Sequence, residues 1–292
     1  MAFSKENTII GFVGTGVMGK SMAGHLLKAG FQVHVFNRTK ARAEELIQMG
    51  AVWFDTISEL AAKSNVIISM VGYPKDVEEV YFGANGVINN AKSGSYLVDM
   101  TTSSPILAEK IYEEALAKGL YALDAPVSGG DVGAKEARLV IMVGGDENVF
   151  KSMGPIFELV GTNVVLQGRA GAGQHTKMCN QIAIASNMLG VCEAMAYATK
   201  AGLNPKNVLK SIESGAAGSW SLSNLAPRFL ENNFAPGFYV KHFIKDMTIA
   251  LDSAKKMGLL TPGLELAKTL YDKLAEQGEK NSGTQVLYKL YL

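Results

Sequence analysis

The sequence is poor in cysteine and carries almost no net charge, and each shortage excludes a class of protein. Cys179 and Cys192 are its two cysteines, and both lie in one apolar stretch, which favours buried free thiols over a disulfide framework or a metal site. The 28 basic and 27 acidic residues give a formal net charge of +1 without a run of like charges. We therefore expect a small-molecule partner, and neither a nucleic acid nor a membrane.

Long apolar runs are also lacking. The longest stretch without a formal charge, residues 178–192, is too short and too polar for us to expect a membrane span. The residues before Ile9 contain no apolar core behind a basic region, so no targeting peptide is expected and the predicted location is cytoplasmic. At 292 residues the chain is about twice the usual single-domain length, which favours two domains.

Two patterns of apolar residues divide the chain. Over residues 1–168, short β-branched runs alternate with amphipathic segments, which predicts an α/β domain with a doubly wound parallel sheet. Over residues 169–292, apolar residues recur at helical spacing, which predicts an all-α C-terminal domain. The expected strands lie in TIIGFV, QVHVFN, NVIISM, SYLVDM, YALDAP and RLVIMVGG, and the expected helices of the second domain cover 173–201, 205–214, 221–232, 240–257 and 262–277.

A glycine-rich turn follows the first predicted strand and leads into a helix-like segment. In a G-x-G-x-x-G turn, the first glycine permits the tight turn, the second lets the backbone approach a pyrophosphate, and the third allows close packing of the helix. The setting of strand, turn and helix favours a Rossmann dinucleotide site over a merely structural turn. The residues predicted to contact the cofactor here are Gly14, Gly16, Val17, Met18 and Gly19.

The end of the second predicted strand indicates which dinucleotide is bound. Asn37, Arg38 and Thr39 follow this strand, and no acidic residue occurs between Phe31 and Ala43. An NAD-selective site usually offers a carboxylate to the ribose 2′-hydroxyl at this point, whereas a guanidinium and a hydroxyl suit a 2′-phosphate. We therefore predict NADP in preference to NAD, against the alternative that Arg38 is a solvated loop residue.

Lys177 is the candidate for acid/base chemistry. It is the only formally charged residue between Arg169 and Glu193, in a segment rich in apolar and small residues. A structural lysine normally lies on a solvated face among other charges, whereas a lysine near apolar walls can have its proton affinity tuned for catalysis.

Three segments combine with the glycine-rich turn into a recognisable set. They read DAPVSGG over 124–130, GAGQHTKMCN over 171–180, and Lys245-Asp246. This set, which spans nearly the whole chain, resembles the β-hydroxyacid dehydrogenase family. That family includes 3-hydroxyisobutyrate dehydrogenase, tartronate semialdehyde reductase and glyoxylate/succinic semialdehyde reductase.

The resemblance implies roles for the residues at the chemical end. It implies that Lys177 is the catalytic acid/base, and that Asn180, on the same helical face, holds the substrate or the lysine. It also implies that Ser128, Gly129 and Gly130 grip the acid group of the substrate. The alternatives are an Asn180 side chain bonded to neighbouring backbone and an ordinary glycine-rich turn.

Further roles follow from the same resemblance. Thr102 is placed near the nicotinamide ribose, with Thr101, Ser103 and helix capping before Pro105 as rival interpretations. The sequence after the strand NVIISM reads Val-Gly-Tyr-Pro where many relatives have Leu-Pro, which weakens the cofactor contacts expected near Val71. The remaining predicted contacts are Met70, Val71 and Lys245 with the cofactor, and Phe238 and Asp246 with the substrate.

The predicted function is hydride transfer between NADP and a short β-hydroxy acid or its semialdehyde. No cluster of acidic, histidine and cysteine residues has metal-ligand spacing, so no metal is expected. The alternatives are an imine or sugar-phosphate reductase on the same architecture, and a nicotinamide-binding sensor or scaffold without turnover. Apolar helices in the second domain favour a homodimer or homotetramer.

Overall fold

The computed structural model describes residues 3–292, which form two compact units. The first unit ends at Lys177 and the second begins at Met178. This division lies inside helix α9 (Ala172–Lys200), whereas the sequence analysis places a domain boundary between residues 168 and 169.

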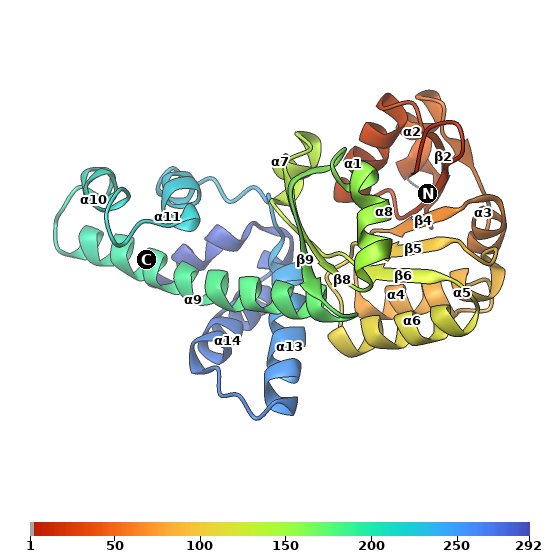
Figure 1. Cartoon of the computed structure of the whole chain (residues 1–292). Coiled ribbons are helices and arrows are strands. Elements are labelled where there is room, and N and C mark those ends of the chain that lie inside the picture. The colour runs from red at the N-terminus through yellow and green to blue at the C-terminus, as the bar shows by residue number, and fades with distance from the viewer. Residues whose placement is uncertain (1–2) are drawn as a thin grey trace. The chain divides into compact units, whose positions relative to one another are not determined.

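A single sheet of nine strands forms the centre of the described part of the first unit (Figure 1). The strands are β1 (Ile9–Val13), β2 (Gln32–Phe36), β3 (Val52–Trp53), β4 (Val66–Ser69), β5 (Tyr96–Asp99), β6 (Tyr121–Asp124), β7 (Val127–Ser128), β8 (Leu139–Gly144) and β9 (Gly161–Gly168). Strands β1 to β6 run parallel in the spatial order β3-β2-β1-β4-β5-β6. The order therefore reverses between β1 and β4, and ligands of such sheets bind beyond the carboxyl ends of the strands at this reversal.

Helices cover both faces of this sheet, which confirms the predicted doubly wound architecture. They are α1 (Val17–Lys28), the 3-10 helix η1 (Lys40–Ala43), α2 (Glu44–Gln48), α3 (Ile57–Lys63), α4 (Pro74–Phe82), α5 (Val87–Asn90), α6 (Pro105–Ala117), α7 (Gly130–Lys135) and α8 (Glu147–Phe157). Alternate strand residues point to opposite faces: Val66 and Ile68 of β4 join the core under α1, α2 and α8, while Ile67 joins the core under α3, α4 and α6. Burial on both faces explains why these strands are nearly continuous apolar runs.

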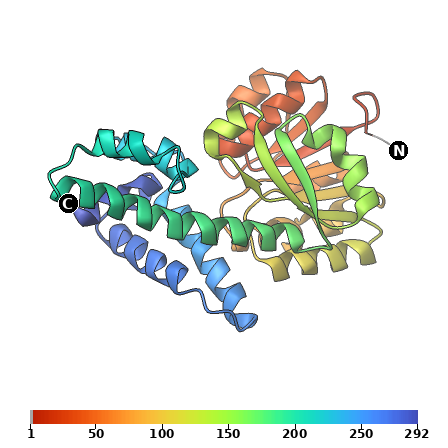
Figure 2. The same ribbon diagram turned by 60° about the vertical axis from the view of Figure 1, so that its left-hand side comes forward.

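The last strands of the first unit depart from the predicted parallel order. Strand β8 is antiparallel to β6 and β7. Strand β9 pairs in parallel with β8, and the two lie side by side as the long light-green strands of Figure 2. Only the short helix α7 connects β7 to β8, and a parallel crossover needs about a dozen residues or more. The short connection therefore returns the chain in the opposite direction.

The described residues of the second unit are mainly helical, as predicted. The elements that follow α9 are α10 (Pro205–Ile212), α11 (Trp220–Asn224), α12 (Ala226–Leu230), α13 (Val240–Lys256), α14 (Pro262–Glu276), and the 3-10 helices η2 (Glu279–Asn281) and η3 (Thr284–Tyr291). The prediction of a single helix over 221–232 is wrong, because α11 and α12 share this range. Pro227 lies at the start of α12, where its missing N–H and its ring prevent α11 from continuing.

Helix α9 has no distinct apolar face, and its residues from Met178 onward contribute to the core of the second unit. By length and mean hydropathy alone, α9 is also the one described helix that suffices to cross a membrane, a test that the core helix of a globular protein passes equally. Helix α9 is long enough for this test because it extends beyond the uncharged stretch 178–192, which alone is too short for a membrane span. Its buried Gln174 and Gln181 are both hydrogen-bonded to other protein groups.

Candidate active site

The glycine-rich turn lies between β1 and α1, at the reversal of the strand order. Gly14 has φ +97°, and a Cβ there would lie 2.3 Å from the carbonyl oxygen of Met70. A Cβ on Gly19 would lie 2.0 Å from the carbonyl oxygen of Gly14, whereas a Cβ on Gly16 would meet nothing within 4 Å. The first and third glycines are thus required by the fold. The second leaves open space in front of the helix N-terminus, and the first turn of α1 carries no acidic residue. These features fit the pyrophosphate of a dinucleotide.

Asn37, Arg38 and Thr39 follow β2 beside this turn. The Asn37 Oδ1 accepts from the N–H of Thr15 at 3.2 Å, and its Nδ2 donates to the Thr39 carbonyl at 2.9 Å. The Arg38 guanidinium donates to Asp76 at 3.0 Å, with 80% of its side chain exposed. Asp76 belongs to α4, beyond the segment from Phe31 to Ala43 that lacks acidic residues, so the sequence analysis missed this ion pair.

Loops after β4 and β5 form the other side of the reversal. The N–H of Val71, which follows Met70, donates to the Thr101 Oγ1 at 3.0 Å. Thr101 and Ser103 are buried, while Thr102 between them is half-buried. Helix α6 begins after Ser104, whose side chain makes no capping bond. Of the three candidate hydroxyls, Thr102 is therefore the one with an exposed portion.

Buried carboxylates end β5 and β6. Asp99 Oδ1 accepts from the Ser69 hydroxyl at 2.8 Å and from the Thr101 N–H at 3.1 Å. Burial raises the pKa of Asp99, the bonds from Thr101 and Ser69 oppose this rise, and the nearby Asp124 adds to it, so that the pKa is about 6. Burial also raises the pKa of Asp124, against the opposing effect of bonds from the N–H groups of Gly171 and Gln174.

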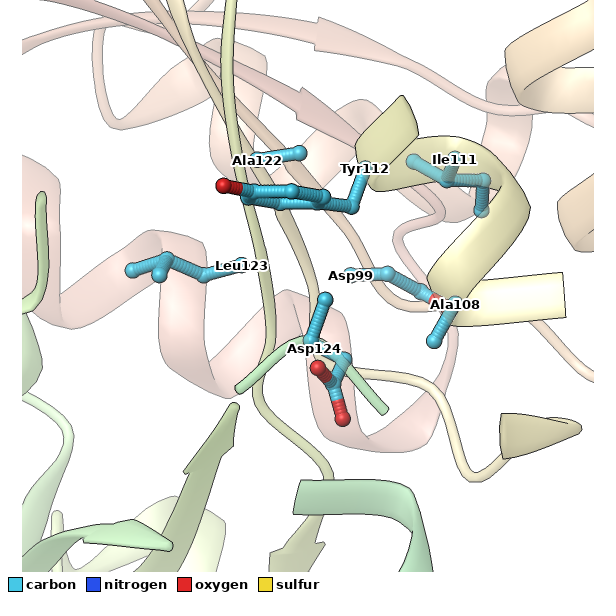
Figure 3. A pocket seen from close by; sticks show the side chains of 8 residues that line it. Asp99, Ala108, Ile111, Tyr112, Ala122, Leu123 and Asp124 are labelled. Atoms are coloured by element: carbon cyan, nitrogen blue, oxygen red, sulfur yellow. The ribbon is translucent and has the colours of Figure 1, made fainter. Parts of the chain in front are cut away.

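A cavity of about 10 Å³ lies beside these carboxylates (Figure 3). It is lined by the two carboxylates, by Tyr112 and Ala108 of α6, and by Ala170 among others. Such a volume is at the lower limit for one water molecule. The carboxyl group of Asp124 points away from the Tyr112 ring in Figure 3. The cavity is thus too small for a substrate.

Ser128 ends β7, Gly129 follows it, and Gly130 begins α7. Ser128 is half-buried, and Gly129 and Gly130 have φ +126° and +64°. These left-handed conformations favour glycine, which leaves the backbone N–H groups unhindered by a side chain. The loop is therefore compatible with binding a carboxylate.

Lys177 lies in the second turn of α9 and is 6% exposed. Gln174, one turn earlier, is fully buried and bonds to the β5–α6 loop that carries Thr102. The glycine-rich turn, the Asn37 segment, the Met70 and Thr102 loops and Lys177 all belong to the first unit.

The other predicted site residues lie in the second unit. Asn180 Nδ2 donates to the Gln181 Oε1 at 2.7 Å, and the Gln181 Nε2 donates to the Asp246 Oδ2 at 2.6 Å. Lys245 Nζ forms an ion pair of 2.9 Å with Asp246, which is 2% exposed. These four residues form one polar cluster. Phe238 instead packs edge to face against Phe243, with ring centroids 5.7 Å apart.

The sequence analysis assigned no role to Asp99, Asp124, Gln174 or Gln181. A signal for the two aspartates was present, because each ends a predicted strand, and parallel neighbours bring such ends together. Nothing in the spacing indicates the bonds of the two glutamines. Within the described residues, no group of three or more histidine, cysteine or acidic residues could hold a metal ion.

Comparisons with known proteins give a consistent result. Residues 9–168 match the family described as the NAD binding domain of 6-phosphogluconate dehydrogenase, and residues 171–291 match the NAD-binding family of NADP-dependent 3-hydroxyisobutyrate dehydrogenase. The chain is 66% identical to the uncharacterized oxidoreductase YkwC of Bacillus subtilis, over 97% of this chain and 98% of that protein. It is 40% identical to the 2-hydroxy-3-oxopropionate reductase of Escherichia coli, over 92% of each chain. The solved structure of Mycobacterium tuberculosis 3-hydroxyisobutyrate dehydrogenase with L-serine is similar, with a TM-score of 0.90 and 29% identity over 97% of this chain and 98% of that one.

Proposed function

Because this chain belongs to the 3-hydroxyisobutyrate dehydrogenase family of NAD(P)-dependent oxidoreductases, we propose that it transfers a hydride between NADP and a short β-hydroxy acid or the matching semialdehyde. The predicted resemblance to this family and the predicted enzyme class are confirmed. The observation that carries the finer proposal is Lys177, a buried lysine in the unit that holds the dinucleotide turn.

The chemistry divides between the cofactor and the chain. When bound, NADPH supplies a hydride to the carbonyl carbon of the semialdehyde. In the proposed reaction, the Lys177 ammonium donates a proton to the carbonyl oxygen as negative charge develops there. In the oxidative direction, the neutral Lys177 amine accepts the hydroxyl proton of the β-hydroxy acid. The N–H groups of the loop 128–130 bind the substrate carboxylate and orient it.

Arg38 supports the preference for NADP. A guanidinium has five N–H donors, and the ion pair with Asp76 occupies only part of this set. We infer that Asp76 holds the guanidinium beside Asn37, and that the exposed remainder binds the 2′-phosphate with the Thr39 hydroxyl. No carboxylate from the segment after β2 competes for a ribose hydroxyl.

The names of two similar proteins support a substrate class of short acids. One is named for 2-hydroxy-3-oxopropionate, and the other is named for 3-hydroxyisobutyrate and has a solved structure with L-serine. All three compounds carry a carboxylate and an oxygen on the β-carbon. We propose that this chain recognises the same pattern.

The decisive experiment measures NADPH oxidation with 2-hydroxy-3-oxopropionate, glyoxylate and succinic semialdehyde, and NADP reduction with 3-hydroxyisobutyrate and L-serine. Each assay is repeated with NAD(H). Lys177→Ala is expected to lower kcat by about 10² to 10⁴, the usual contribution of a general acid/base. Lys200→Ala, on the exposed end of the same helix, is the matched control and is expected to keep full activity.

Three outcomes separate the alternatives. Turnover that survives in Lys177→Ala would remove the lysine from the mechanism. Cofactor binding without turnover of any compound would support a sensor or scaffold. Turnover of cyclic imines in place of the acids would support an imine reductase.

We also propose a cytoplasmic location and a homodimer or homotetramer. The location is supported by the two free cysteines, Cys179 and Cys192. Assembly is supported by large apolar side chains exposed on the second unit, among them Leu260 at 87% and Tyr197 at 75%. Light scattering on the purified protein tests the assembly, and a monomer at micromolar concentration would refute it.

A further inference from the structure

The first turn of α9 is completed by a carboxylate from another element. Asp124, at the end of β6, accepts from the Gly171 N–H with Oδ1 and from the Gln174 N–H with Oδ2, both at 2.8 Å. The N–H groups at a helix start have no partner inside the helix, and a negative charge is favourable there. The first turn of α9 has no acidic residue of its own. Asp124 therefore anchors the start of α9 to the sheet.

The backbones of α9 and β8 are in close contact at this anchor. A Cβ on Gly173 would lie 2.3 Å from the carbonyl oxygen of Met142, in β8. A Cβ on Gly144 would lie 2.8 Å from the N–H nitrogen of Gly173. Helix and strand approach so closely that only glycine fits at these two positions.

Gln174 extends the anchor to the loop between β5 and α6. Its side-chain Oε1 accepts from the Ser103 N–H at 2.8 Å, and its Nε2 donates to the Thr101 carbonyl at 2.7 Å. These two bonds enclose Thr102, whose own backbone lies between the two bonded residues. The side chain is fully buried, so water cannot replace either bond.

The same loop is tied to its other neighbour. Thr101 accepts from the N–H of Val71 through its hydroxyl, and its own N–H donates to Asp99. The β4–α4 loop, the β5–α6 loop and the start of α9 therefore form one bonded assembly. Both loops are predicted to contact the cofactor, the β5–α6 loop through Thr102 near the nicotinamide ribose, and α9 carries Lys177.

We propose that Gln174 is a positioning residue, which holds the Thr102 loop and Lys177 in the relative placement that hydride and proton transfer require. The inference rests on the proposed function. Gln174 and Lys177 are three residues apart, which places them about 4.5 Å apart along the helix axis. A misplacement of about 1 Å in an active site costs about 10²-fold in rate. Gln174 thus acts on kcat through Lys177 and Thr102, without contacting the substrate.

Gln174→Leu tests the loss of both bonds. It retains a side chain of similar size but leaves the Ser103 N–H and the Thr101 carbonyl without their partner. We expect kcat to fall about 10- to 100-fold, while the Kd for NADPH changes by less than about threefold, because the turn and the Arg38 segment are untouched. Gln48→Leu, on the exposed end of α2, is the matched control and should behave as wild type.

Gln174→Glu tests the bonding pattern itself. A protonated carboxyl group has one acceptor and one donor, as the amide has, whereas a carboxylate only accepts and would face the Thr101 carbonyl. We therefore expect kcat near the wild-type value at low pH and a fall with rising pH that wild type lacks. The ionisable groups around this position are Asp124 on β6, Asp99 on β5, and His175 and Lys177 on α9. All four remain in wild type and in Gln48→Glu, so a pH dependence found only in Gln174→Glu belongs to the new carboxyl group.

The outcomes distinguish this inference from the proposed function. Absence of turnover in wild type would overturn both. Wild-type turnover that is unchanged in Gln174→Leu, or a Gln174→Glu profile parallel to that of wild type, would overturn the inference alone. If both Gln174 variants lose kcat, NADPH affinity and melting temperature together, and low pH does not restore kcat in Gln174→Glu, Gln174 contributes to stability only.

Discussion

Asp99→Asn is expected to stabilise the first unit at alkaline pH. Asp99 is 4% exposed, and burial raises its pKa from 3.8 to about 6. A raised carboxyl pKa means that the folded state retains the proton more tightly than the unfolded state. The associated stability is therefore fully present below about pH 4 and is lost as the pH rises through about 6.

The magnitude follows from the size of the shift. A difference of about two pKa units, at 1.36 kcal/mol each, makes ionised Asp99 cost up to about 3 kcal/mol of unfolding free energy. Asparagine keeps an Oδ1 acceptor for the Ser69 hydroxyl and the Thr101 N–H, but carries no charge to desolvate. We expect Asp99→Asn to gain about 1 to 3 kcal/mol at about pH 8, and little at about pH 4.

The two tryptophans make this measurable. Trp53 lies in β3 of the first unit and Trp220 lies in α11 of the second, with 69% of its surface exposed. In a Trp220→Phe background, fluorescence during urea unfolding reports only on the first unit. Asp252→Asn, at an exposed position of α13, is the control for removing one negative charge. Two results would falsify the assignment of a buried, destabilising charge. One is an unfolding free energy of Asp99→Asn below that of the parent at about pH 8. The other is a plot of unfolding free energy against pH that has the same slope in Asp99→Asn and the parent between about pH 4 and 7.

Two further predictions concern α9 and the cofactor. Gly173→Ala is expected to lose about 1 to 3 kcal/mol of unfolding free energy through its clash with the Met142 carbonyl, whereas Gly190→Ala in the same helix meets nothing within 4 Å and should gain up to about 1 kcal/mol; equal thermal shifts for the two would contradict this. Arg38→Ala is expected to raise the KM for NADPH about 10-fold, the low end for a charge-assisted pair at an exposed site, and to leave the KM for NADH unchanged. Initial rates with NADPH and with NADH give the two KM values, and a parallel rise in both would show that Arg38 does not bind the 2′-phosphate.

The parts of the fold carried by local patterns were predictable. Strands such as Val66–Ser69 are apolar on both faces, and Gly14, Gly16 and Gly19 lie at the expected junction of strand and helix. The antiparallel direction of β8 was not predictable from residue types, because it depends on the length of the connection after β7. Pro227 marks the break between α11 and α12 in the sequence itself, although apolar residues keep a helical spacing on either side of it.

The candidate site divides in the same way. Lys177 and Ser128 lie in motifs of adjacent residues, so the sequence alone singles them out. The bond from Gln174 to Ser103 spans 71 positions, and the pair of Arg38 and Asp76 spans 38. Such partners are neighbours only because parallel strands bring their ends to one edge. No spacing rule along the chain identifies them.

The anchoring of α9 by Asp124 also affects hydrogen exchange at the start of this helix. The first turn of a helix is normally where it frays, and its amide hydrogens exchange quickly with solvent. Here the N–H groups of Gly171 and Gln174 are bound by a residue 47 and 50 positions upstream, on a strand in the middle of the sheet. Their protection against hydrogen exchange therefore depends on β6 having joined the sheet, and these amides open together with the sheet rather than with the end of their own helix.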